Sequence, residues 1–62
     1  MIKQYDKVKL VNGNYAIIVE ILETDKAYIA DIDLANGDCT TDTIFHMDIA
    51  ALIDEVERPV AI

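Results

Sequence analysis

The stretch YAIIVEILETDKAYIADIDL, residues 15–34, decides the fold, because two strand-like segments flank a turn. If Thr24 and Asp25 form a tight turn, Glu23 faces Lys26 and the segments pair as an antiparallel hairpin. Side chains alternate between the two faces of a strand. This register predicts one apolar face, formed by Tyr15, Ile17, Val19 and Ile21 opposite Leu34, Ile32, Ala30 and Tyr28. The other, mixed face carries Ala16, Ile18, Glu20 and Leu22 opposite Asp33, Asp31, Ile29 and Ala27.

Residues 5–11 alternate in the same way and predict a first strand. Val8 and Leu10 would point to the core, while Lys7 and Lys9 would point outward and discourage pairing with another chain. The sequence Asn12-Gly13-Asn14 predicts a turn after this strand, because Asn and Gly tolerate a positive φ.

A second hairpin turn is predicted at Asn36-Gly37, with a strand over residues 38–46, but two registers remain open. A two-residue turn sets Asp31 opposite Asp42, an unfavourable pair of like charges, and directs Ile44 outward. A bulge would separate the carboxylates and direct Ile44 inward.

The C-terminal part predicts one helical turn and a last strand. Asp48 is placed as an N-cap, and Ile49, Leu52 and Ile53 follow at helical spacing, which predicts a short 3₁₀ or α turn. Residues 54–58 alternate around Val56 and predict a final strand that Pro59 ends. The predicted core consists of Val8, Leu10, Ile17, Val19, Ile21, Ala30, Ile32, Ile49, Leu52 and Val56.

The composition is that of one small globular domain, residues 1–62, with 53% hydrophobic residues. The net charge is −7, of which residues 1–14 contribute +2 and residues 15–62 contribute −9. Binding to nucleic acid needs clustered Lys and Arg, so no nucleic-acid partner is expected. No apolar run is long enough to cross a membrane and no signal peptide is recognised, so a cytoplasmic location is expected.

Residues for catalysis or metal binding are sparse. Cys39 and His46 are the single cysteine and histidine, and together with Asp48 they would form a triad only in an enclosing cleft, which so small a domain is not expected to provide. Asp31, Asp33 and Asp42 suit a hard cation, but three aspartates on a sheet are more often solvated. We expect no enzyme, no cofactor and no metal.

Five short strands with one short helical (3₁₀) turn before the last strand give an all-β chain that resembles a Src-homology-3-like small barrel. Tyr5-Asp6-Lys7-Val8-Lys9-Leu10, Ala16-Ile17-Ile18-Val19-Glu20 after Gly13, Ala27-Tyr28-Ile29-Ala30-Asp31-Ile32-Asp33, and Thr43-Ile44 leading to Asp48-Ile49 carry the resemblance. They look like a family of small uncharacterised bacterial barrel proteins. The polyproline-binding branch of this fold uses tryptophans, of which this chain has none, and Lys7 stands where that branch would have its second tyrosine.

The expected function is therefore a non-enzymatic protein-interaction module, with self-association as one form. The alternative is an acidic antagonist, similar in role to an antitoxin, that occludes the basic surface of a toxin or nuclease. The candidate partner-binding residues share the outer face of the central hairpin: Ile18, Glu20, Ile29, Asp31 and Asp33. Ile18 and Ile29, with residues 60–62 as a further contributor, would support a weak homodimer.

Overall fold

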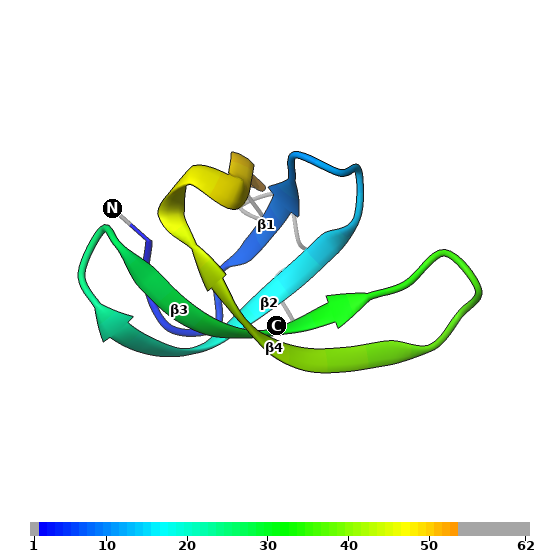
Figure 1. The fold of residues 1–62 in the computed structure, drawn as a ribbon, viewed down its shortest axis with the longest axis horizontal. Coiled ribbons are helices and arrows are strands. Elements are labelled where there is room, and N and C mark those ends of the chain that lie inside the picture. The colour runs from blue at the N-terminus through cyan, green and yellow to red at the C-terminus, as the bar shows by residue number, and fades with distance from the viewer. Residues whose placement is uncertain (1, 54–62) are drawn as a thin grey trace, which may run out of the picture.

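A computed structural model describes residues 2–53 of the chain. Five antiparallel strands form a single sheet in the order β4-β3-β2-β1-β5 (Figure 1). The elements are β1 (Lys7–Leu10), β2 (Tyr15–Glu23), β3 (Ala27–Asp33), β4 (Cys39–Phe45), the 3₁₀ turn η1 (His46–Asp48) and β5 (Ile49–Ile53). The predicted all-β class is confirmed for this part of the chain. The sheet is not closed, since β4 and β5 form its two edges.

Two glycine turns share one geometry. In the turn between β1 and β2, the Gly13 N–H donates to the Leu10 carbonyl at 2.9 Å, and the Leu10 N–H donates to the Asn14 carbonyl at 2.7 Å. Gly13 has φ 95°, in the left-handed region that favours glycine. A hairpin loop of three residues with glycine last matches this pattern, and the third position supplies a bulge.

A loop of the same geometry joins β3 to β4 and decides between the two registers that the sequence leaves open for β4. Gly37, at φ 93°, donates to the Leu34 carbonyl at 3.1 Å, and Leu34 donates to the Asp38 carbonyl at 2.8 Å. The loop therefore has three residues rather than two. Asp31 lies opposite Thr41, and Ile44 lies opposite Tyr28 in the core, so the inward register of Ile44 is the one adopted.

A bulge in β2 corrects the predicted hairpin register. Glu20 and Ile21 lie opposite Ile29 and Tyr28 as predicted, but the register shifts between Ile18 and Glu20. Before the shift, Ile18 lies opposite Ala30 rather than Asp31. The extra residue reverses which side chains face the core, so the predicted inward placement of Tyr15, Ile17 and Val19 is wrong. Ala16 and Ile18 are buried in their place.

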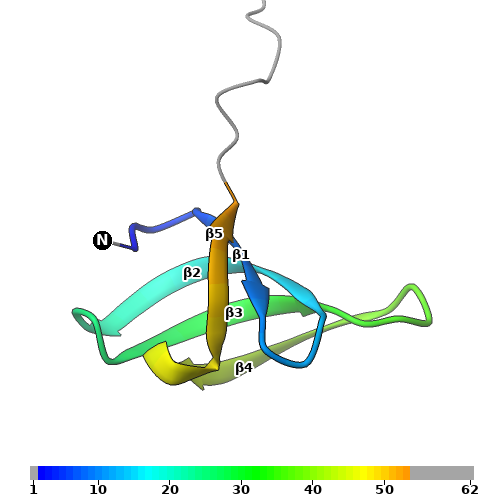
Figure 2. The same cartoon turned by 90° about the horizontal axis from the view of Figure 1, so that it is seen from above.

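The segment before β1 hydrogen-bonds to β2 next to the bulge, at Ile18 and Val19. The Tyr5 N–H donates to the Ile18 carbonyl at 2.6 Å, the Ile18 N–H donates to the Asp6 carbonyl at 2.9 Å, and Gln4 Nε2 donates to the Val19 carbonyl at 2.9 Å. Two residues of this segment thus oppose one residue of β2, which is a second bulge. Tyr5 has φ 73°, unusual for a bulky side chain. Irregularities on both sides of Ile18 accompany the arch of β2 (Figure 2).

The core lies on the concave face of the sheet. Its buried members are Ile2, Val8, Leu10, Ala16, Ile18, Tyr28, Ala30 and Ile44, with Ile21, Ile32 and Ile49 packed against them. The predictions for Val8, Leu10 and Ala30 are confirmed. Ile17 and Val19 are only half-buried, Leu52 is 49% exposed, and Val56 lies outside the described residues. Tyr28 is buried without an unsatisfied hydroxyl because its oxygen lies 2.8 Å from His46 Nδ1.

The predicted helical turn beginning at Asp48 is wrong. The 3₁₀ turn ends at Asp48, whose carboxylate accepts the Phe45 N–H at 2.9 Å, and the next five residues form β5. This segment is apolar at every position, so its periodicity does not distinguish a strand from a helix. The predicted strand over residues 54–58, its end at Pro59 and the tail of residues 60–62 lie outside the described residues. The lysines of β1 were expected to protect an exposed edge strand. This expectation is wrong, because β1 pairs with β5 and is not at an edge of the sheet.

Within residues 2–53, no helix has the length and apolar character needed to cross a membrane.

Candidate interaction surface

The face of the sheet opposite the core carries rows of side chains that cross all five strands. Cross-strand partners share a face, so the register identifies the members of each row. One row consists of Thr41, Asp31, Ile17, Lys7 and Ile53, and the next consists of Cys39, Asp33, Tyr15, Lys9 and Ala51. We call this surface the outer face.

The β1 side of the outer face is basic and aromatic. The ammonium groups of Lys7 and Lys9 lie 5.4 Å and 5.8 Å from the centroid of the Tyr15 ring. Both distances fall within the range of a cation–π interaction, which at an exposed site contributes about 0.5–1 kcal/mol. Tyr15 is 40% exposed, so one of its edges remains available to a partner.

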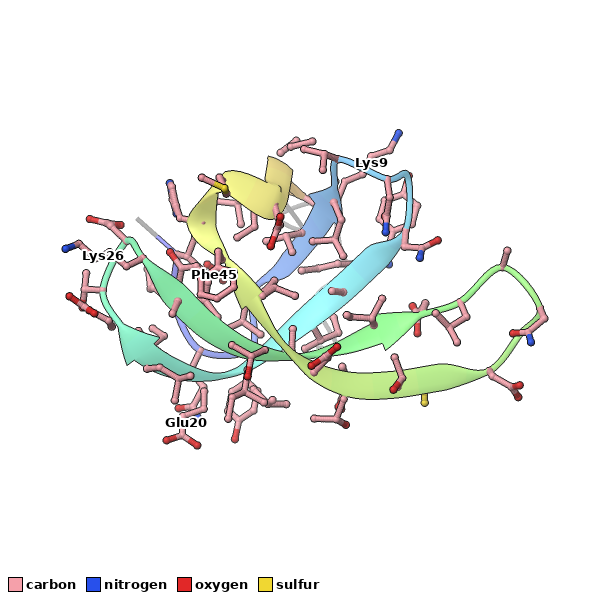
Figure 3. The ribbon with its side chains drawn as sticks, in the orientation of Figure 1. Lys9, Glu20, Lys26 and Phe45 are labelled. Carbon is pink, nitrogen blue, oxygen red and sulfur yellow. The ribbon has the colours of Figure 1, made fainter. Side chains whose placement is uncertain are left out.

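The β2–β3 side of the outer face is acidic. Asp31 and Asp33 lie opposite Ile17 and Tyr15, while Glu20 lies opposite Ile29. Figure 3 shows Glu20 at the bottom of the molecule, far from Lys9 and Phe45 at the top, with its carboxylate pointing into solvent. The Thr41 hydroxyl donates to the Asp31 carboxylate, which fixes this acid in place while Asp33 stays exposed.

Four of the five predicted site residues lie on this face, and one does not. Glu20, Ile29, Asp31 and Asp33 are placed as predicted, with Ile29 half-buried. Ile18 is 0% exposed in the core and is unavailable to any partner, so its predicted place on the outer face is wrong. The bulge before Glu20 is the physical reason. Ile17, half-buried between Asp31 and Lys7, takes its position on the outer face.

The outer face is therefore polarised. Acids occupy β3 and the far half of β2, lysines occupy β1, and the half-buried Ile17 lies between them. Neighbouring strands are about 4.8 Å apart, so the lysine and aspartate backbones of one row are separated by roughly 10 Å. Direct ion pairs do not neutralise the acids across that distance. The one salt bridge among residues 2–53 joins Lys26 to Glu23 at 3.5 Å in the β2–β3 turn. The register places Glu23 opposite Ala27, so the predicted position of Glu23 opposite Lys26 is wrong, although the two charges meet.

The residues considered for catalysis do not come together. Cys39 begins β4 and His46 follows its end, so at about 3.3 Å per residue they are roughly 23 Å apart. His46 Nδ1 is engaged by the Tyr28 hydroxyl, and the Asp48 carboxylate is engaged by the Phe45 N–H.

The aspartates considered for a metal lie on two faces of the sheet. Asp42 is opposite the buried Ala30 and so shares the core side, whereas Asp31 and Asp33 are on the outer face. Across residues 2–53, no group of three His, Cys, Asp or Glu side chains is arranged to hold a metal ion.

Comparison with protein-family models, with curated proteins and with solved structures finds no match to this chain.

Proposed function

We propose that this chain is a non-enzymatic protein-interaction module of the Src-homology-3-like small-barrel type that acts in the cytoplasm. The order of elements supports the fold assignment: four strands follow one another in the sheet, and a 3₁₀ turn leads to a fifth strand beside the first. The long, bulged β2 supports it as well, because strong bending lets one strand serve both halves of a barrel.

The polarised outer face is the observation that carries the proposed function. Exposed carboxylates of Glu20 and Asp33 surround the half-buried Ile17 and Ile29, with lysines along one border. Carboxylates on one side of a modest apolar centre steer a basic partner, lysines on the other side fix its orientation, and the apolar centre contributes burial. The partner favoured by this face presents apolar side chains with basic residues on the side that meets β3.

Affinity capture from the native host tests this proposal. The immobilised chain is compared with Glu20→Gln/Asp31→Asn/Asp33→Asn, which removes three charges from the outer face and keeps the Thr41 acceptor. The matched control, Glu23→Gln/Asp38→Asn/Asp42→Asn, removes three charges from the end of β2, the β3–β4 turn and the core side of β4. Wild type and control should capture the same protein, and the outer-face variant should lose it. Equal capture by all three would contradict the proposal.

The alternative function is an acidic antagonist of a basic toxin or nuclease. The gathering of Glu20, Asp31 and Asp33 on one side of the outer face favours it. A strongly basic partner whose own activity is inhibited by this chain would support the antagonist. Its association rate should fall steeply with salt for wild type and more gently for the outer-face variant. A partner of neutral charge, bound with the same rate at low and high salt, would exclude the antagonist and leave the general interaction module.

A further inference from the structure

Two exposed turns of this chain contain the same reactive pair, an asparagine followed by a glycine. They are Asn12-Gly13 between β1 and β2 and Asn36-Gly37 between β3 and β4. The backbone nitrogen of the glycine can attack the side-chain Cγ of the asparagine, because glycine has no side chain to hinder the approach. The reaction is intramolecular, so its rate depends on how readily the turn lets the two atoms meet.

The folded turns restrain both glycine nitrogens in the same way. Each glycine N–H donates to the carbonyl of the residue three positions earlier, Leu10 at 2.9 Å and Leu34 at 3.1 Å. Each asparagine Oδ1 accepts the N–H of the residue two positions later, at 2.9 Å in the first turn and 3.0 Å in the second. The attacking nitrogen must lose the proton that the carbonyl holds, so the reaction requires the turn to open locally.

The two turns differ in what must open with them. The Val11 N–H donates to the Asp48 carbonyl at 2.9 Å and so ties the β1–β2 turn to η1. Among residues 2–53, the backbone hydrogen bonds of residues 34–38 stay within the β3–β4 hairpin. Figures 1 and 2 both show this turn extending beyond the rest of the described chain.

The side-chain contact in the β3–β4 turn is also local. Asn36 Nδ2 donates to the Asp38 carboxylate at 3.2 Å, and both side chains are exposed. This bond joins two residues of one turn and does not connect the turn to another element. The β3–β4 turn can therefore open without breaking a backbone hydrogen bond to another element, whereas the β1–β2 turn cannot.

We propose that Asn36 is a site of spontaneous deamidation in the folded chain, and that it is converted faster than Asn12. The Gly37 nitrogen forms a bond to Asn36 Cγ and gives its proton to a solvent base. The bond from Cγ to Nδ2 breaks, and Nδ2 takes a proton from solvent and leaves as ammonia. Water then opens the cyclic imide: attack at Cγ gives aspartate, and attack at the backbone carbonyl carbon gives isoaspartate.

Either product changes the β3–β4 turn. Conversion adds one negative charge to a chain whose net charge is already −7. It replaces the amide that donates to Asp38 by a carboxylate, so two like charges meet in place of a hydrogen bond. Isoaspartate also adds one carbon atom to the main chain of the loop that sets the register of β4. The modified chain should therefore have a less stable hairpin at this edge of the sheet.

Peptide mapping by mass spectrometry tests the proposal on the full chain aged at mildly alkaline pH. It measures the deamidated fraction at Asn12 and Asn36 in one sample, and the same measurement in urea gives the rate of each site in the unfolded chain. The ratio of unfolded to folded rate removes the effect of neighbouring residues. This ratio should be about fivefold larger at Asn12, which is the contribution of one hydrogen bond, about 1 kcal/mol, converted at about tenfold per 1.4 kcal/mol.

Proline substitutions at the equivalent position of the two turns separate the tie to η1 from the turn itself. Val11 and Ala35 each follow the residue that accepts the glycine N–H, and proline is favoured at this position of a turn. Val11→Pro removes the N–H that donates to Asp48, so deamidation at Asn12 should rise about fivefold. The Ala35 N–H has no such acceptor within residues 2–53, so Ala35→Pro measures the effect of proline alone and should not raise the rate at Asn36.

Three results would overturn the proposal. They are an Asn36 that stays intact in the folded chain, a ratio of unfolded to folded rate at Asn36 equal to or larger than that at Asn12, or no gain in Val11→Pro relative to Ala35→Pro. Circular dichroism checks that both variants are folded. The comparison of the two asparagines in wild type needs no variant, so it decides the test if either variant is unfolded.

Discussion

Replacing Ile18 tests the bulged register of β2 against a regular hairpin. Ile18 is 0% exposed and opposite the buried Ala30, whereas Ile17 is half-buried on the outer face. In a regular hairpin the two isoleucines would exchange roles. Truncation of a fully buried isoleucine to alanine removes its transfer free energy and leaves a cavity, at a cost of about 2–5 kcal/mol.

The expected size of the effect is large for this chain. At about 0.05–0.15 kcal/mol per residue, 62 residues give a total stability of roughly 3–9 kcal/mol. A loss of about 3 kcal/mol in Ile18→Ala would lower Tm by roughly 12–24 °C, at about 4–8 °C per kcal/mol. Ile18→Val is the milder companion, with a loss of about 1 kcal/mol. Ile17→Ala should cost less than half as much as Ile18→Ala, because the outer-face side chain is already partly in water.

Thermal and urea unfolding followed by circular dichroism measures both series, since the chain contains no tryptophan for fluorescence. The ratio of the two losses decides the register, and it does not depend on the absolute stability. A loss for Ile17→Ala equal to or greater than that for Ile18→Ala would refute the bulge between Ile18 and Glu20.

Three further variants probe backbone strain and burial by the same unfolding measurements. Tyr5→Gly should stabilise the fold by about 1 kcal/mol, because glycine adopts the φ of 73° without steric cost; an unchanged or lower Tm would mean that tyrosine contacts outweigh the strain. Gly37→Ala should lose about 1 kcal/mol through its φ of 93° alone, since no atom lies within 4 Å of an added Cβ; a neutral result would contradict the three-residue turn. Burial and, to a lesser extent, the Asp25 carboxylate raise the pKa of Tyr28 above 10.0, so the unfolded chain loses this proton first. The contribution of the protonated Tyr28 to the free energy of unfolding should be fully present below pH 10 and should be lost as the pH rises through the pKa of Tyr28 in the folded chain. Tyr28→Phe should flatten this loss of stability.

Parts of the fold with an unambiguous alternation could be predicted from the sequence. Asp31 and Asp33 alternate with the apolar Ala30 and Ile32, so only one face of β3 can be buried. The lysines of β1 specify its faces in the same way. In these strands a reversed orientation would bury charge, which costs several kcal/mol without a partner.

The errors fall where both faces are apolar. Tyr15, Ala16, Ile17 and Ile18 offer two nearly equal hydrophobic rows. The bulge between Ile18 and Glu20 decides which row is buried, and the alternation of the sequence does not indicate that bulge. β5 is apolar throughout and reads equally well as a helical turn. The candidate surface follows the same division: the placement of the β3 acids on the outer face was predicted correctly, and that of Ile18 was not.

Nuclear Overhauser effects between the backbone protons of β2 and β3 test the bulged register most directly, and the membership of the outer face depends on this register. Residues that lie directly opposite each other in an antiparallel pair bring their backbone protons close together. Contacts of Ile18 with Ala30 and of Ile17 with Asp31 are the expected result. Contacts of Ile18 with Asp31 instead would contradict the account, because Ile18 would then belong to the outer face.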